Sequence, residues 1–386
     1  MRFTVVSCET YPNGGAASNR HLAYLEALAR HGHQVELIPI GQSDGHVSAK
    51  ISVNSLKVIT ESRAKFHLQA LIRLFGVMWS TRSHREPHAV LYLATSGFLA
   101  IPVLLTRWWS RAVVFHERTE LPELMVGRGV LSRADFAIYK WLFSLFDGIF
   151  VITHALKGAV SAYPGVKSNR VQVLNMIVDI DRFSGARYSS ESLRKIVFCG
   201  DLSSDKDGVE MLLRAFRKFA EDRPEVELSL AGSIDNPYYR STLRPLVEAN
   251  RPGTVNVIGQ VKRDLVPSLL ASADLLVLAR PDNEQAKYGF PTKLGEYLAT
   301  GKPVLVTKTG EISRFLVDKV SAYICQADME SFFARLEEIY YAYGDAAVVG
   351  SRGREVAEVS FSAANAARQI ETAVRAAMNG EMESAQ

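Results

Sequence analysis

The sequence predicts an α/β protein built from two doubly wound domains, each a parallel sheet covered by helices. Short apolar runs typical of buried strands alternate with stretches typical of helices, first over residues 1–182 and again over 183–361. The chain has 386 residues, which is long for one domain. Near residues 183–193 the sequence turns polar, as a linker does. We therefore expect one domain over 1–182 and a second over 183–361, facing each other across a cleft.

Composition excludes several classes of protein. Apolar residues make up 47% and charged residues 22%, which is ordinary for a globular protein, and the net charge of +4 does not suggest a nucleic-acid binder. Cys8, Cys199 and Cys325 have no metal-binding or redox spacing, so we expect a reducing, cytoplasmic compartment. The N-terminal residues are typical of a strand rather than a signal peptide, and no apolar run approaches the roughly 18 residues of a membrane span.

The first domain opens with a strand at 3–8, a glycine-rich turn, a helix ending at Arg30 and a strand at 34–40. Gly14 and Gly15 in the turn would let a ligand approach the backbone closely. The spacing is not that of a dinucleotide fingerprint, so a plain tight turn is an equal alternative.

Further along, strands are predicted at 90–95, 112–115 and 148–153. His116 and Glu117 follow the second of these directly, where side chains project into the crevice of an open sheet. Imidazole exchanges protons near neutral pH, which suits catalysis. The alternative is a histidine whose ring is held by structural hydrogen bonds.

Two segments of the first domain, 65–85 and 99–111, are both apolar and basic, with Trp beside Lys or Arg. Such a combination suits the interface of a membrane. Core helices with basic ends are the alternative. We expect charge reversal at Arg73 and Arg107 to reduce liposome binding if the first interpretation holds.

The second domain begins with a strand at 195–199, a loop from Gly200 to Gly208 that contains Lys206, and a helix at 209–221. The remaining strands are predicted at 226–231, 255–258, 274–279, 304–307 and 322–325.

Residues 288–307 contain the most informative pattern in this domain. A helix is predicted to begin at Thr292, whose hydroxyl would cap it, and to stop at Gly301. The start of a helix attracts phosphate, and Lys293 adds a positive charge there. Glu296 lies one turn further, where its carboxylate would accept the hydroxyls of a ribose. Phosphate and ribose together define a nucleotide site. The alternative is a solvated glutamate on an ordinary helix.

The chain resembles the retaining glycosyltransferases of family 4, which have the two-domain GT-B fold, over nearly its whole length. The resemblance rests on the Asn13-Gly14-Gly15 turn, His116, the block from Val173 to Phe183, the block from Gly200 to Gly208, and the block from Asp274 to Val304. It implies that a last helix, at 362–380, returns to the first domain.

This resemblance also implies the roles of individual residues. His116 would act at the reacting centre, and the donor would be bound by Gly14, Gly15, Lys206, Gly289, Phe290, Pro291, Thr292, Lys293 and Glu296. The expected reaction moves a sugar from a UDP- or GDP-linked donor to a glycan or lipid-linked acceptor, in the assembly of bacterial-type surface polysaccharide or glycolipid. No metal or other cofactor is expected, and Asp179-x-Asp181 is interpreted as part of the interdomain block. The expected location is the cytoplasm, with a contact at the inner face of the membrane as an option.

Two positions depart from the family pattern. Tyr288 stands where the family has the first glutamate of an E-x7-E pair, and Asp201 stands where it has an arginine. Glu284 does not have the spacing to replace the missing glutamate. These departures motivate the alternative function, a nucleotide-sugar-binding partner subunit without catalysis. We expect Asp201 to point away from a bound diphosphate, since two negative charges repel at close range.

Overall fold

The structure is a computed structural model that describes residues 1–12, 14–40, 47–58, 63–81, 86–127, 133–183 and 191–381. These residues form two compact units. Unit 1 comprises Met1–Ile177 and Ala363–Gln386, and unit 2 comprises Val178–Ser362. The sequence-based boundary after residue 182 falls within the short turn Ile180–Phe183 of unit 2. Residues 184–190 of the expected linker lie outside the described residues.

Within its described residues, unit 1 has a seven-stranded parallel sheet in the order β3-β2-β1-β4-β5-β6-β7. The strands are β1 (Arg2–Ser7), β2 (Gln34–Pro39), β3 (Ile51–Val53), β4 (His88–Tyr92), β5 (Val113–Arg118), β6 (Gly148–Val151) and β7 (Val171–Val173). Every residue of β4 and β6 is buried, as in strands covered on both faces. The sequence did not predict β3, because three residues around a serine give no usable period.

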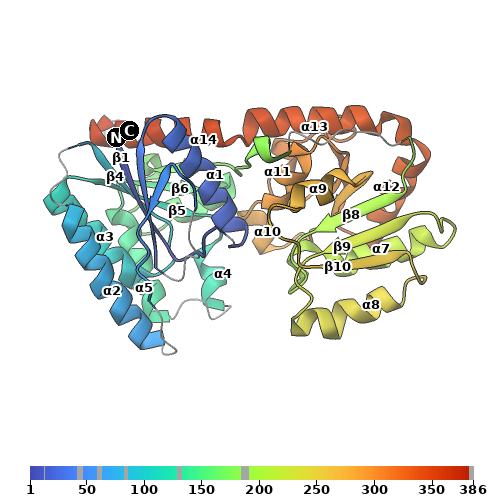
Figure 1. The fold of residues 1–386 in the computed structure, drawn as a ribbon, viewed down its shortest axis with the longest axis horizontal. Helices are drawn as coiled ribbons and strands as arrows, with labels where there is room; N and C mark the ends of the chain where they lie inside the picture. The colour runs from blue at the N-terminus through green and yellow to red at the C-terminus, as the bar shows by residue number, and fades with distance from the viewer. Residues whose placement is uncertain are drawn as a thin grey trace. The chain divides into compact units, whose positions relative to one another are not determined.

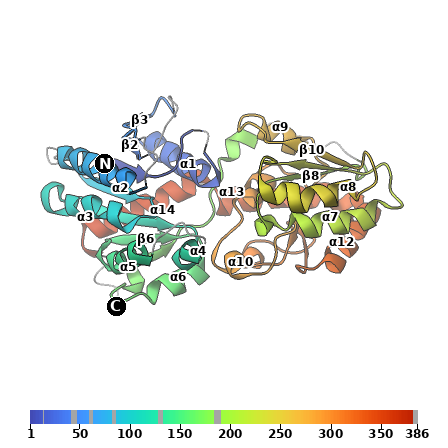
Figure 2. The same cartoon turned by 90° about the horizontal axis from the view of Figure 1, so that it is seen from below.

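Helices cover both faces of this sheet (Figures 1 and 2). They are α1 (Ala16–Arg30), α2 (Arg63–Ser80), α3 (Gly97–Ser110), α4 (Pro122–Gly127), α5 (Arg133–Leu142), α6 (His154–Ser161) and α14 (Ala363–Met378). The last helix joins the same core as β1 and α1, where Phe3, Leu28, Ile370 and Val374 are buried together. The expected return of the C-terminal helix to the first domain is therefore confirmed.

Unit 2 contains a parallel sheet in the order β10-β9-β8-β11-β12-β13. The strands are β8 (Lys195–Cys199), β9 (Glu227–Ala231), β10 (Val255–Gly259), β11 (Leu275–Leu278), β12 (Val304–Thr307) and β13 (Tyr323–Cys325). The helices are α7 (Val209–Ala220), α8 (Arg244–Glu248), α9 (Val266–Ala271), α10 (Glu284–Tyr288), α11 (Thr292–Ala299), α12 (Met329–Tyr341) and α13 (Ala346–Ser360). In Figure 1, α11 and α13 lie above the sheet, and α8 lies below it.

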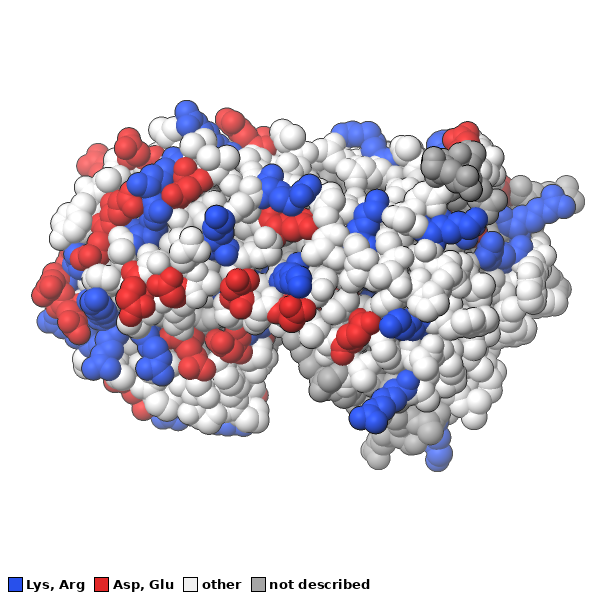
Figure 3. Space-filling model, turned by 180° about the vertical axis from the view of Figure 1, so that it is seen from behind, with Lys and Arg blue, Asp and Glu red and all other residues white. Residues whose placement is uncertain are grey.

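The surface carries charges of both signs. On the face shown in Figure 3, acidic and basic side chains are interspersed over unit 2, at the left of the picture. Such mixing agrees with the small net charge of the chain. No helix in the described part of the chain is both long enough and apolar enough to span a membrane.

Candidate functional site

The start of α11 is the centre of the candidate site in unit 2. The helix begins at Thr292 as expected, and Gly301 adopts a positive φ of 72° just beyond its end. The predicted cap is wrong. Pro291 occupies the N-cap position, so Thr292 is the first helical residue and no side chain caps the helix. The N–H groups of the first turn therefore lack a side-chain acceptor, which leaves an anion-binding helix end.

Lys293, in the first turn of α11, is held over the loop that follows β8. Its Nζ lies 2.7 Å from Oδ2 of Asp207, whose side chain is only 3% exposed. The same carboxylate oxygen accepts a hydrogen bond from the backbone N–H of Asp201 at 3.1 Å. A Cβ atom on Gly200 would lie 2.6 Å from Cε of Lys293. Any larger residue at position 200 would therefore clash with the lysine side chain in this position. The ammonium is thus fixed in place beside the helix start.

Glu296 lies one turn further along the same helix. Its carboxylate is 3.5 Å from the guanidinium of Arg182, and both side chains are about one-fifth exposed, at 22% and 18%. Burial raises the pKa of Glu296, although the positive charges of Arg182, Lys293 and Arg263 oppose the shift. A partly buried carboxylate with one flank open to solvent is able to accept hydroxyl groups from a ligand.

The loop between β8 and α7 holds its own acidic residue. The carboxylate of Asp201 accepts hydrogen bonds from the N–H and hydroxyl of Ser203 and from the hydroxyl of Ser204. Burial opposes ionisation, but these hydrogen bonds outweigh it and lower the pKa of Asp201. Asp201 is therefore engaged within its own loop. Lys206 follows in the turn Asp205–Asp207 and is half-buried.

The residues between α10 and α11 support the helix start from below. The N–H of Gly289 donates to the carbonyl of Gln285. The ring of Phe290 is 7% exposed and packs against Phe315 and Phe361, with centroids 5.5 and 5.6 Å away. Gly289, Phe290 and Pro291 thus set the position of the α11 backbone.

Tyr288 and Glu284, the two residues considered for the position of the missing family glutamate, both lie on α10. Tyr288 is the last residue of α10, and the Nζ of Lys287 lies 5.0 Å from the centre of its ring. Glu284, at the start of α10, is 61% exposed and pairs with Lys287 at 3.4 Å. Glu284 therefore does not stand in for the missing family glutamate.

The remaining predicted residues belong to unit 1. A Cβ atom on Gly14 would lie 2.2 Å from the carbonyl oxygen of Thr10, so the tight turn itself requires this glycine. Gly15 is the N-cap of α1 and would have open space around a Cβ atom. Asn13 lies outside the described residues.

His116 does not lie past the end of a strand, as the sequence suggested. β5 continues to Arg118, and the His116 ring has no exposed surface. Nδ1 lies 2.7 Å from the carbonyl oxygen of Tyr92, and Nε2 is hydrogen-bonded to the hydroxyl of Tyr139. Burial, together with the charge of Arg118, lowers its pKa to about 3. The geometry thus favours the structural alternative, with a neutral imidazole in the core of unit 1.

The sequence did not reveal the partners of several charged residues. Asp207 and Arg182 both lie within blocks that resemble the family, but their positions gave no hint of their partners. In unit 1, Glu117 is buried and accepts from Arg20 at 2.7 Å and from the hydroxyl of Tyr24 at 2.9 Å. Arg20 also donates to the carbonyl of Leu174. Glu117 lies 97 residues from Arg20 along the chain, so no local pattern could reveal this pair.

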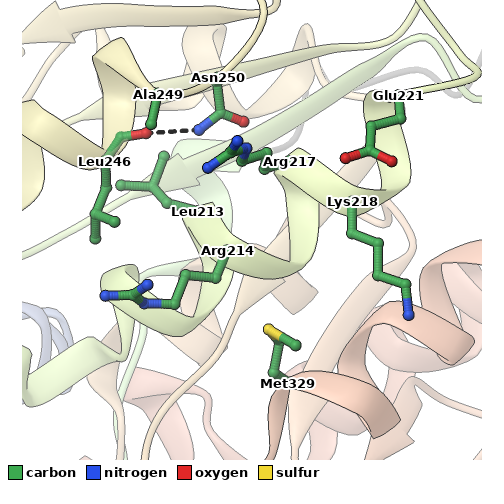
Figure 4. Close-up of a pocket in the computed structure, with 9 residues that line it drawn as sticks. All are labelled: Leu213, Arg214, Arg217, Lys218, Glu221, Leu246, Ala249, Asn250 and Met329. Atoms are coloured by element: carbon green, nitrogen blue, oxygen red, sulfur yellow. Dashed lines mark hydrogen bonds between the residues drawn. The ribbon is translucent and has the colours of Figure 1, made fainter.

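A cavity of about 280 Å³ lies elsewhere in unit 2 (Figure 4). It is lined by Leu213, Arg214, Arg217, Lys218, Glu221, Leu246, Ala249, Asn250 and Met329. None of these is a predicted donor-binding residue. Among the described residues, no group of three or more His, Cys, Asp or Glu side chains is arranged to hold a metal ion.

Two doubly wound units, a last helix that rejoins the first, and an uncapped helix start with a lysine and a glutamate define the GT-B class. Sequence comparison agrees: residues 14–175 match the family described as glycosyl transferase 4-like domain, and residues 194–341 match glycosyl transferases group 1. The chain belongs to this family of GT4-like glycosyltransferases, and it is an enzyme of that class. No curated protein matches it in sequence comparison.

Solved structures share the fold at low sequence identity. The sucrose-phosphate synthase of Thermosynechococcus elongatus is 15% identical, with a TM-score of 0.77 over 98% of this chain and 99% of that one. Anabaena Alr3699/HepE in complex with UDP is 15% identical, with a TM-score of 0.73 over 97% and 100%. WaaG, a glycosyltransferase involved in lipopolysaccharide biosynthesis, is 14% identical, with a TM-score of 0.70 over 96% and 98%.

Proposed function

We propose that this glycosyltransferase moves a sugar from a nucleotide diphosphate sugar, linked to UDP or GDP, to an acceptor hydroxyl with retention of anomeric configuration. The observation that carries the proposal is the start of α11. Its first-turn N–H groups have no side-chain cap, Lys293 is fixed beside them, and Glu296 follows one turn later. The helix start can bind an anion, and the carboxylate one turn further can accept hydrogen bonds from hydroxyl groups. This pairing suits a diphosphate joined to a ribose.

In this proposal the helix start, Lys293 and Lys206 stabilise the negative charge that develops on the leaving diphosphate. Glu296 accepts the ribose hydroxyls. The family resemblance suggests a front-face reaction in which the leaving phosphate takes the acceptor proton, so no protein nucleophile is required. We assign His116 no role at the reacting centre in this proposal, since its ring is buried and both its nitrogens are hydrogen-bonded.

The relatives support a uridine donor and a cell-surface product. Anabaena HepE has been solved with UDP and with UDP-glucose, and WaaG is involved in lipopolysaccharide biosynthesis. We therefore propose UDP-sugars as the first donors to try, and a glycolipid or surface polysaccharide precursor as the acceptor. No metal is proposed for the reaction, and turnover that persists in a chelator would support this choice.

The test is a thermal-shift screen of the full chain against UDP, GDP, ADP and their glucose or mannose conjugates, followed by transfer and donor-hydrolysis assays. A ligand that binds only the folded form raises the melting temperature. One nucleotide should stabilise the wild type and fail to stabilise Glu296→Ala, while Glu284→Ala, an exposed glutamate on α10, behaves as wild type. If the nucleotide binds but neither transfer nor hydrolysis occurs, the catalytic proposal is wrong and the partner-subunit alternative holds.

We also propose that α2 and α3 rest on a membrane surface that carries anionic lipids. Four large apolar side chains of α2 follow helical spacing and are exposed: Leu68 by 60%, Ile72 by 61%, Phe75 by 43% and Trp79 by 44%. On α3, Trp108 is 83% exposed. Residues 63–81 and 97–111 contain no Asp or Glu, so the charges there are positive. Apolar exposure without negative charge suits an anionic bilayer interface.

The arginines chosen from sequence are poor probes of this contact. Arg73 donates to the backbone carbonyls of Leu56 and Lys57, and Arg107 pairs with Asp147 at 2.9 Å. Their substitution would disturb unit 1 itself. Residues 82–85 of the predicted segment lie outside the described residues.

A sharper test replaces Leu68 and Ile72 with Gln and measures flotation with phosphatidylglycerol vesicles. Binding should fall strongly in the double variant and remain in Val348→Gln, a 54% exposed residue of α13 in unit 2. Equal flotation of all three proteins would contradict the membrane proposal.

A further inference from the structure

Unit 1 contains a buried arginine without an acidic partner. Arg118 is the last residue of β5 and is 4% exposed. No ion pair joins it to any carboxylate of the described residues. A buried charge without compensation costs several kcal/mol, so proteins seldom keep one without a use for it.

Among the described residues, the groups that accept from Arg118 are uncharged, and the hydroxyl of Tyr139 is one of them. Its terminal Nη2 donates to the sulfur of Met125 at 2.8 Å and to the carbonyl of Glu120 at 3.4 Å. The guanidinium lies 5.7 Å from the centre of the Tyr139 ring. Its Nε is buried and has no hydrogen-bond partner. A thioether is a poor acceptor and Nε has no acceptor, so part of the donor capacity of this guanidinium is unused.

Three acidic residues of this part of unit 1 have other partners. Glu123, on α4 beside Met125, accepts from the hydroxyl of Tyr163 at 2.7 Å and pairs with Lys140 at 3.7 Å. Asp135 accepts from the N–H of Phe98 at 3.2 Å. Glu117 points to the opposite face of the sheet, toward Arg20.

The position of Arg118 is that of a ligand-binding residue. Ligands of parallel α/β sheets bind at the carboxyl ends of the strands, and Arg118 is the carboxyl-terminal residue of a central strand. Met125, a flexible and half-exposed side chain of α4, accepts from a terminal nitrogen of Arg118. An oxyanion that displaced the Met125 sulfur would gain charge-assisted hydrogen bonds from the guanidinium.

We propose that Arg118 binds an anionic group of the acceptor substrate, a phosphate or phosphodiester, in unit 1. This inference rests on the proposed function, since it assigns the acceptor of that reaction. The diphosphate of the donor has its own cations in unit 2, at Lys293 and Lys206. The acceptor would then be a phosphorylated sugar or a phospholipid-linked glycan rather than a neutral sugar.

The experiment uses inorganic phosphate as the probe, titrated at constant ionic strength against the full chain and read as thermal shift. Variants are Arg118→Met, which keeps the length and loses the charge, Arg118→Lys, and the control Arg107→Met, which removes an arginine paired with Asp147. Phosphate should give a saturable upward shift in wild type and Arg107→Met. In Arg118→Met the affinity should fall about tenfold or more, as expected for lost charge-assisted hydrogen bonds.

Without phosphate, Arg118→Met should melt at or above the wild-type temperature, whereas Arg107→Met should melt lower. A destabilised or unfolded Arg118→Met protein would overturn the proposal, because the charge would then be compensated within unit 1. Arg118→Lys keeps the positive charge but loses the planar guanidinium, which can donate two hydrogen bonds to one phosphate. This variant should keep a weakened rise in melting temperature with phosphate. No saturable shift in the wild type, or equal shifts in wild type and Arg118→Met, would also overturn it.

UDP titrations separate this inference from the donor proposal. UDP should bind wild type and Arg118→Met equally and leave the phosphate shift in place. If UDP abolishes the phosphate shift of the wild type, the phosphate site belongs to the donor and the acceptor assignment is wrong. If UDP fails to bind any variant while the Arg118-dependent phosphate shift persists, the donor proposal fails and the anion site stands.

Discussion

Replacement of Lys293 by Met tests the candidate site most directly. The Nζ of Lys293 and Oδ2 of Asp207 are 2.7 Å apart, with side-chain exposures of 21% and 3%. At that separation, Coulomb's law with an effective dielectric constant of about 20 gives a gross attraction of about 6 kcal/mol. Desolvation of both groups offsets most of this, but loss of one partner leaves Asp207 as a buried, uncompensated carboxylate. We expect Lys293→Met to lower the free energy of unfolding by about 2 kcal/mol.

The same substitution should weaken UDP binding by about 10- to 100-fold, since a charge-assisted hydrogen bond to phosphate is lost and the Asp207 charge faces the ligand. Urea unfolding measures the first effect and titration calorimetry with UDP the second. Adding Asp207→Asn to Lys293→Met should restore part of the stability while UDP affinity stays low. Lys287→Met, which removes an exposed lysine from α10, is the matched control. Wild-type stability and UDP affinity in Lys293→Met would refute the reasoning.

Three further predictions test local features. Because the pKa of Glu296 is raised above its ordinary 4.5, the folded state holds this proton more tightly, and the free energy of unfolding falls as pH rises from 4.5 through the raised pKa. At pH 7, Glu296→Gln should therefore have a urea midpoint equal to or higher than that of the wild type, while it loses UDP affinity. A lower urea midpoint would contradict this. Burial opposes ionisation of Glu371 on α14, but contacts with His31 and His33 lower its pKa below 4.5. The stabilising effect of this carboxylate is therefore present above pH 4.5 and is lost as pH falls through the lowered pKa. Glu371→Gln should have a lower melting temperature than the wild type near pH 6, and the difference should shrink in acid. Gly208 and Gly253 both have positive φ, but only at Gly208 would a Cβ atom clash with a neighbour, at 1.8 Å from the carbonyl oxygen of Ala279. Urea unfolding should show that Gly208→Ala lowers the free energy of unfolding by about 3 kcal/mol and Gly253→Ala by about 1 kcal/mol. Equal losses would count against the packing argument.

The sequence predicted the layer architecture well because buried parallel strands carry a local signal. Runs such as Leu275–Leu278 and Val304–Thr307 are apolar at nearly every position, and helix ends such as Gly301 have a local chemical marker. The start of α11 at Thr292 was predicted correctly for the same reason. Its capping was not, because the dihedral angles of Pro291, rather than the preference of threonine, decide which residue is the N-cap.

The polar residues of unit 1 could not be placed from sequence. The end of β5 is written as His116-Glu117-Arg118, which locally is typical of a loop. These residues continue the strand because partners distant in sequence satisfy them, Tyr139 for His116 and Arg20 for Glu117. Such contacts depend on tertiary packing, which no local period encodes.

The inclusion of α14 in unit 1 has a consequence for biosynthesis. Residues 1–177 emerge from the ribosome first, but Ile370 and Val374 complete the core around Phe3 and Leu28. Unit 2 is continuous in sequence, so the nascent chain can complete the fold of unit 2 while the core of unit 1 still lacks α14. A premature stop just before Ala363 would therefore harm the half of the protein made earliest.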